Sequence, residues 1–143
     1  MTNINKLIQD LTLQEKISLM SGFNSWYTNK IDRLNIPSIK MSDGPNGVRG
    51  DSTSGKSSAC FPCAISIGST WDIDLINQLG VALGEEAKVK DVDVLLGPTI
   101  NIHRHPLGGR HFESFSEDPF LTGKIATEYV KGVQSQNVAA CLK

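Results

Sequence analysis

The chain has 143 residues, 39% of them hydrophobic and 20% charged, which is the composition of an ordinary folded domain and excludes a disordered or collagen-like segment. Its formal net charge of -1 leaves no positive excess for binding a nucleic-acid backbone or an anionic membrane surface. The first thirty residues show no signal-peptide pattern, and no apolar run approaches the roughly 18 residues of a membrane span, so we expect an intracellular, cytoplasmic protein without a membrane partner.

The N-terminal part of the chain predicts one helix and one strand. Thr12 and Glu15 have the spacing of a capping box, in which each side chain accepts a hydrogen bond from the backbone N–H of the other residue. This spacing predicts a helix over residues 13–20 that ends at Gly22. The short apolar segment 38–42 then predicts a strand, because turn-forming residues follow it.

The rest of the chain alternates between strands and helices. We expect strands over residues 64–68, 93–97 and 138–142, and helices over residues 73–90 and 119–136. Near-continuous apolar strands between helices indicate an α/β fold with parallel strands and the helices packed outside. A closed barrel of this kind takes about 250 residues, so we interpret residues 1–143 as an incomplete, N-terminal portion of a TIM-like (β/α)8 barrel. Unpaired sheet edges then predict marginal solubility for the isolated chain.

The segment from Gly50 to Ser57 matches the phosphate-binding pattern G-x-x-x-x-G-K-[ST], but its surroundings do not suit a nucleotide site. Such a loop needs a strand that leads into the glycine turn and a helix that begins at the lysine. No strand precedes Gly50, and Pro62 would interrupt a helix begun at Lys56 within two turns. We interpret the segment as a surface loop and keep a P-loop NTP-binding domain as the alternative hypothesis.

The cysteines and histidines do not have the spacing of a redox or metal site. The chain has three cysteines, and this odd and small number argues against a disulfide framework. Cys60 and Cys63 have C-x-x-C spacing, but the apolar segment 64–67 predicts a strand where a redox pair would precede a helix. His103 and His105 have no third ligand at zinc spacing, so we expect no metal ion.

Two polar side chains follow predicted strands. Asp43 lies at a strand end, where parallel α/β proteins bind ligands, although a turn in which Asp43 bonds its own backbone explains its position equally well. Arg110 offers a rigid fork of donors for a carboxylate or for sugar hydroxyls, but an ion pair with an acidic neighbour is the simpler interpretation. The acidic neighbours are Glu113, Glu117 and Asp118. The last two flank a helix start, where negative charge stabilises the helix dipole.

Several motifs occur in order along almost the whole chain. They are the segments 42–49 (SDGPNGVR), 61–62 (FP), 68–72 (GSTWD), 97–104 (GPTINIHR), 109–119 (GRHFESFSEDP) and 138–143 (VAACLK). Together they resemble the N-terminal barrel domain of glycoside hydrolase family 3, in the branch that contains the β-glucosidases. The resemblance implies that the parent enzyme removes terminal non-reducing β-D-glucosyl residues by a retaining mechanism, without a metal or organic cofactor.

The resemblance also implies roles for four residues. Asp43 matches the aspartate that binds hydroxyls at the far end of the non-reducing sugar, and Arg49, at the end of the same motif, is expected to orient it. Arg110 matches an arginine that donates to sugar hydroxyls. Lys143 matches the lysine of a Lys-His pair whose histidine would follow directly. His105 and His111 depart from the usual family residues, and we expect them to affect the shape of a subsite.

No catalytic residue is assigned within this chain. In the family, the nucleophilic aspartate lies on a later barrel strand and the acid/base glutamate lies in a following domain, so both are expected beyond residue 143, and the isolated chain is expected to be inactive. The expected partner is a small-molecule β-glucoside or oligosaccharide, and a homo-oligomer is a candidate assembly. The alternative is a non-catalytic truncated or split product.

Overall fold

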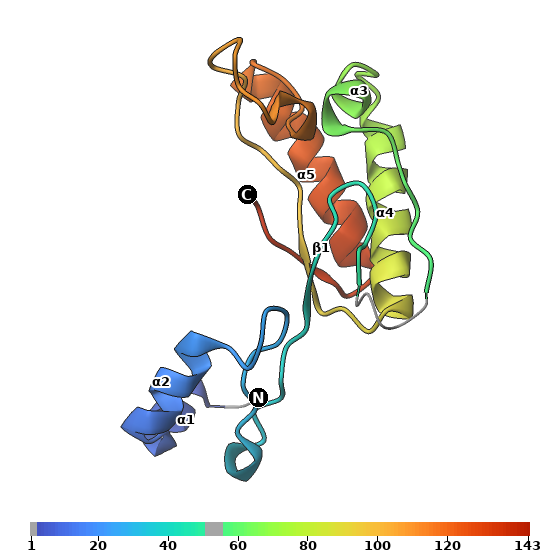
Figure 1. The fold of residues 1–143 in the computed structure, drawn as a ribbon. Helices are drawn as coiled ribbons and strands as arrows, with labels where there is room; N and C mark the ends of the chain where they lie inside the picture. Colours follow the sequence, from blue (N-terminus) through green and yellow to red (C-terminus); the bar gives the residue numbers. More distant parts are fainter. Residues whose placement is uncertain (1–2, 51–55) are drawn as a thin grey trace. The chain divides into compact units, whose positions relative to one another are not determined.

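The computed structural model describes residues 3–50 and 56–143, and the chain divides into two compact units after Met41. The N-terminal unit contains α1 (Ile4–Asp10), α2 (Leu13–Ser21) and a short 3-10 helix, η1 (Asp32–Leu34) (Figure 1). The predicted capping box is confirmed, since the Thr12 N–H donates to Glu15 Oε2 over 2.8 Å and the Glu15 N–H donates to the Thr12 hydroxyl over 3.3 Å. Sequence analysis missed α1, although Asn3 caps it through a hydrogen bond from the Lys6 N–H.

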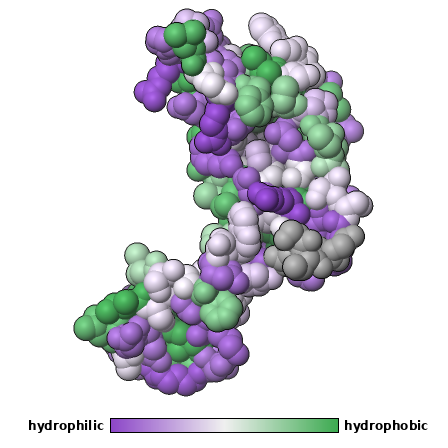
Figure 2. All heavy atoms as spheres, viewed as in Figure 1, coloured by the Kyte–Doolittle hydropathy of each residue, from purple (hydrophilic) through white to green (hydrophobic). Residues whose placement is uncertain are grey.

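The two N-terminal helices contain no buried residue. The apolar face of α2 is exposed, with Leu13, Ile17 and Met20 at 74%, 52% and 88% of their full accessibility. Figure 2 shows apolar residues at the surface of this unit. An ion pair between Arg33 and Glu15 links η1 to α2, with Arg33 Nε 2.7 Å from Glu15 Oε1. Polar contacts and caps therefore hold a large part of this unit together.

The second unit is built on a three-stranded sheet. Its strands β1 (Met41–Asp43), β2 (Val94–Leu96) and β3 (Ala139–Ala140) lie in the order β1-β2-β3. Strands β2 and β3 are parallel, with Val94 opposite Ala139 and Leu95 opposite Ala140. The helix α5 (Pro119–Ser135) provides the crossover that a parallel pair needs. This arrangement agrees with a partial α/β barrel.

The long helices α4 (Ile73–Val89) and α5 lie side by side against the sheet (Figure 1). Their close crossing depends on Gly80 and Gly132, because a Cβ atom at either position would overlap the backbone of the opposite helix. Fully buried side chains fill the space between the helices and the sheet; they include Ile76, Leu83, Leu95, Ile125, Tyr129 and Val133.

Both long helices were predicted correctly because their caps are local. The carboxylate of Asp72 accepts hydrogen bonds from two N–H groups at the start of α4, and Asp118 does the same for one N–H of α5, where Pro119 occupies the first turn. Among the described residues, no helix is long and apolar enough to cross a membrane.

The prediction of a strand over residues 64–68 was wrong, because this segment forms the helix α3 (Ala64–Gly68). Its buried residues are Ala64, Ile67 and Gly68, which have helical spacing, and Gly68 packs against the backbone of Phe115. The other strands are shorter than expected: β1 is shifted toward Asp43, and β3 covers two residues of the predicted segment 138–142.

Candidate functional site

The carboxylate of Asp43 and the ammonium of Lys143 form an ion pair, although 100 positions separate them in the sequence. Lys143 Nζ lies 2.8 Å from Asp43 Oδ1. Asp43 is the last residue of β1, and Lys143 follows β3. The segment after β3 is held beside the segment after β2, since the Lys143 N–H donates to the Pro98 carbonyl over 3.1 Å and the Ile100 N–H donates to the Lys143 carbonyl over 2.6 Å. The strand ends thus bring two of the four predicted site residues together.

Arg110 forms a two-pronged ion pair with Glu113. Arg110 Nε lies 2.7 Å from Glu113 Oε1, and Arg110 Nη2 lies 2.6 Å from Glu113 Oε2. Both residues belong to one turn, because Glu113 ends the 3-10 helix η2 (His111–Glu113) that follows Arg110. The structure therefore selects Glu113 from the three acidic neighbours considered as partners for Arg110.

The two ion pairs affect each other electrostatically. The hydrogen bond from Arg110 holds the pKa of Glu113 below its usual value, with the charge of Lys143 acting in the same direction and that of Asp43 opposing it. The hydrogen bond to Glu113 raises the pKa of Arg110, and the negative charge of Asp43 adds to this effect. Two carboxylates and two cations from separate segments thus form one group of charges.

A cavity of about 450 Å³ lies against this group, a volume typical of small-molecule sites. Its walls include Arg110, Glu113 and Lys143. The other lining residues are Thr99, Asn101, Gly108, Gly109, His111 and Ser114. Charged groups, two hydroxyls and an amide around one hollow can hydrogen-bond a ligand that carries many hydroxyl groups.

Arg49 contacts Asp43 through its backbone. The Arg49 N–H donates to the Asp43 carbonyl over 2.9 Å, while the Arg49 side chain is exposed and has no hydrogen bond or ion pair within residues 3–50 and 56–143. The main chain at Arg49 therefore helps to fix Asp43. A role for the guanidinium of Arg49 stays a prediction.

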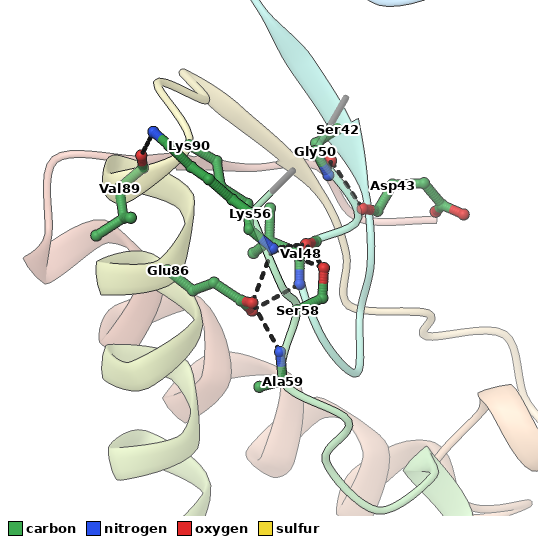
Figure 3. A network of polar contacts seen from close by, with 10 residues as sticks. All are labelled: Ser42, Asp43, Val48, Gly50, Lys56, Ser58, Ala59, Glu86, Val89 and Lys90. Atoms are coloured by element: carbon green, nitrogen blue, oxygen red, sulfur yellow. Dashed lines mark hydrogen bonds and ion pairs between the residues drawn. The ribbon is translucent and has the colours of Figure 1, made fainter. Parts of the chain in front are cut away.

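Sequence analysis missed a buried ion pair between Glu86 in α4 and Lys90, the residue that directly follows this helix (Figure 3). Lys90 Nζ lies 2.9 Å from Glu86 Oε1, and the Lys90 side chain is only 2% exposed. The signal in the sequence was a Glu and a Lys four positions apart on a predicted helix, which is common on solvent-exposed faces. Only the fold shows that the loop after β1 covers this pair.

The remaining motif hypotheses concern the loop after β1. Part of the P-loop match, residues 51–55, lies outside the described residues. Gly50 and Lys56, which flank these residues, lie at the C-terminal end of α4: Lys56 donates to the Val89 carbonyl, and Gly50 packs against Lys90. A phosphate site instead needs the N-terminus of a helix. This placement does not support nucleotide binding.

The C-x-x-C segment precedes a helix, so the expectation of a strand after it was wrong. The helix is α3, and Cys63 occupies its N-cap position. Cys60, Cys63 and Cys141 are all free. Within the described residues, no group of three or more His, Cys, Asp or Glu side chains is arranged to hold a metal ion.

The loop over residues 103–113 is held by its own histidines. The His103 ring lies 3.0 Å from the Ser114 carbonyl through Nε2, and His111 Nε2 contacts the His105 carbonyl. The rings of His103 and His111 lie 4.7 Å apart. A Cβ atom at Gly108 would overlap the His111 ring, so this glycine allows the loop to fold tightly.

Comparison with known proteins identifies close relatives. Residues 5–143 match the model of the Glycosyl hydrolase family 3 N terminal domain. Probable beta-glucosidase I of Emericella nidulans is 54% identical over 142 residues, which cover 99% of this chain and 17% of that protein. Beta-glucosidase of Rhizobium radiobacter is also 54% identical, over 98% of this chain and 17% of its own length.

Solved structures show the same similarity in three dimensions. The crystal structure of beta-glucosidase from Kluyveromyces marxianus in complex with glucose has a TM-score of 0.94 at 46% identity, and the match covers 100% of this chain and 17% of that one. Beta-glucosidase 3B from Thermotoga neapolitana in complex with glucose has a TM-score of 0.88 at 39% identity, over 98% of this chain and 22% of that one. The chain thus spans about 17% of the length of the curated relatives that it matches.

Proposed function

The chain belongs to glycosyl hydrolase family 3, and from this premise we propose that it forms part of the glucose-binding pocket of a β-glucosidase. The proposed enzyme removes terminal non-reducing β-D-glucosyl residues from small glucosides or oligosaccharides with retention of configuration. The glucose complexes of two similar enzymes support this substrate class.

The observation that carries the proposal is the ion pair between Asp43 and Lys143 beside the polar cavity. The two side chains are 42% and 33% exposed, so both remain accessible to a ligand. A carboxylate has lone pairs for two neighbouring hydroxyls, and an ammonium has three donors, of which Asp43 takes one. In a sugar with two neighbouring hydroxyls, one hydroxyl can donate to Asp43 while the other accepts from Lys143.

Arg110 and Glu113 occupy another part of the same cavity wall. The fork geometry of the guanidinium fixes the Glu113 carboxylate, and the Arg110 side chain is 76% exposed, which leaves donors free for a sugar hydroxyl. In the proposal, Asp43, Arg110 and Lys143 orient the sugar ring, and these contacts strengthen as the ring flattens toward an oxocarbenium-like transition state.

The reacting carboxylates are assigned elsewhere in the enzyme. Retaining hydrolysis needs a nucleophile and an acid/base about 5–5.5 Å apart on either side of the glycosidic bond. Asp43 and Glu113 each form an ion pair with a cation, which favours their role as binding groups. The nucleophile and acid/base are therefore proposed to lie outside residues 1–143.

Hydrolysis of an aryl β-D-glucoside by the full-length protein tests the proposal. NMR spectroscopy of the first product formed is expected to show β-glucose, because retention requires two inversions at the anomeric carbon. Absence of hydrolysis, or α-glucose as the first product, would refute it.

A homo-oligomeric state stays a prediction, which light scattering on the full-length protein checks.

A further inference from the structure

We infer that the buried Glu86–Lys90 ion pair positions Asp43 for sugar binding by fixing the backbone of the loop after β1. This inference rests on the proposed function. It makes Glu86 and Lys90 positioning residues, since neither contacts Asp43 directly. Figure 3 shows the Asp43 carboxylate pointing away from the pair.

The Lys90 ammonium has partners for all three of its donors. It bonds the Val48 carbonyl, the Ser58 hydroxyl at 2.6 Å and Glu86 Oε1 at 2.9 Å. The side chains of Lys90 and Glu86 are 2% and 14% exposed. Replacing a buried ion pair by well-packed apolar side chains of similar size is often neutral for stability, so we assign to this pair the role of holding the loop in its geometry.

The Glu86 carboxylate fixes the loop at two points. Its Oε2 accepts from the Val48 N–H and its Oε1 accepts from the Ala59 N–H, both over 2.8 Å. Burial acts to raise the pKa of Glu86, but the hydrogen bonds from Lys90 and the two N–H groups outweigh this effect and hold the pKa below its usual value. The Val48 N–H is therefore bound to the Glu86 carboxylate, and the Val48 carbonyl is bound to the Lys90 ammonium.

Hydrogen bonds continue from Val48 to Asp43 through the next two residues. The Arg49 N–H donates to the Asp43 carbonyl and the Gly50 N–H donates to the Ser42 hydroxyl, each over 2.9 Å. The Ser42 hydroxyl in turn donates to the Asp43 carbonyl over 2.9 Å. Asp43 thus receives its backbone position from the segment that the ion pair holds.

The test replaces both charges with neutral groups of similar size, as Glu86→Gln with Lys90→Met, in the full-length protein. A glutamine must turn its NH2 group toward one of the two backbone N–H donors, and a methionine makes none of the Lys90 bonds to the Val48 carbonyl and the Ser58 hydroxyl. The loop is therefore held by three hydrogen bonds fewer while the buried volume is kept. We expect kcat/KM for an aryl β-glucoside to fall roughly 10- to 100-fold, because small misplacements of a binding group have effects of this size. The melting temperature is expected to fall, because the buried Val48 carbonyl loses its Lys90 donor, so kcat/KM is measured well below the unfolding temperature of both proteins.

A matched control removes an ion pair between two side chains of α5 that form no hydrogen bond to the loop within the described residues. Glu128 and Lys131 on α5 are 2.7 Å apart and more exposed, so Glu128→Gln with Lys131→Met is expected to leave kcat/KM unchanged. If the Glu86/Lys90 double variant does not fold, Glu86→Asp takes its place. It keeps the charge but shortens the side chain by one methylene, and it is expected to lower kcat/KM in the same way.

Combination with Asp43→Ala shows whether the pair acts through Asp43. We expect the Glu86/Lys90 change to lower kcat/KM by less than about twofold in the Asp43→Ala background, because residues that act as one unit are not additive. Losses that multiply, or a double variant with wild-type kcat/KM, would overturn the inference. A wild-type protein without activity on the glucoside would instead refute the proposed function.

Discussion

Removal of the Asp43 carboxylate tests the candidate site most directly. Asp43 Oδ1 bonds Lys143, while Oδ2 has no protein partner among the described residues and is free to accept from a sugar hydroxyl. Asp43→Ala therefore deletes one or two charged hydrogen bonds to the sugar and leaves Lys143 without its anion. The backbone of residue 43 remains held by Arg49 and Ser42.

The size of the effect follows from the hydrogen bonds that the Asp43 carboxylate is proposed to make to the sugar. A hydrogen bond to a charged group contributes about 1.5–3 kcal/mol. Loss of about 2.7 kcal/mol of transition-state binding corresponds to ~100-fold in kcat/KM, so we expect Asp43→Ala to lower kcat/KM for an aryl β-glucoside at least ~100-fold. Asp43→Asn keeps an acceptor without its charge and is expected to lower kcat/KM about tenfold.

Stability should change far less than activity. The ion pair of Asp43 with Lys143 is partly exposed, and exposed pairs contribute only about 0.2–1 kcal/mol. Steady-state kinetics and thermal unfolding of the full-length protein are measured together, with Asp32→Ala as a control that removes the exposed ion pair to Lys30. An unchanged kcat/KM for Asp43→Ala, or a loss matched by the control, would show that Asp43 does not bind the sugar.

Three further predictions concern charge and packing. Arg110→Lys replaces the fork on Glu113 by a single donor and is expected to lower kcat/KM about tenfold, whereas unchanged kinetics would place Arg110 outside the sugar site. Gly80→Ala puts a methyl group into the backbone of α5 and is expected to destabilise the fold by about 1–3 kcal/mol in urea unfolding; an unchanged midpoint would contradict the close helix crossing. Hydrogen bonds from Arg33 lower the pKa of Glu15 from 4.5 to about 2, so the pair's stabilisation is complete above pH 4.5 and is lost as the pH falls toward 2. An NMR titration checks this, and a Glu15 midpoint near 4.5 would refute it.

The parts of the fold that were predicted correctly depend on local sequence. The caps at Asp72 and Asp118 lie next to the helices that they start, and Gly22 ends α2 with a φ of +72°. The segment 64–68 was misassigned because five residues are too few to separate a buried strand from a short helix. Its helical form depends on packing against Phe115, which is distant in sequence.

The candidate site was predictable to a similar degree. The strand-end rule drew attention to Asp43, and the glycine-rich loop drew attention to Arg110. Lys143 was proposed only from the family resemblance, because its position beside Asp43 depends on the pairing of β3 with β2. Glu86 and Lys90 look like a surface pair in the sequence, and only the path of the loop over α4 buries them.

The loop over residues 103–113 gains its shape from contacts among its own histidines and with Ser114, whereas Asp43 is fixed from α4. The loop that lines the cavity and the aspartate beside the cavity are thus held in place by different contacts. If this loop were exchanged for the corresponding segment of a relative, the part of the cavity wall that the loop forms would change shape. The position of Asp43 would stay the same. In the proposed pocket, the exchange would alter the sugar contact of Arg110, which lies in this loop, and would leave the contact of Asp43 in place.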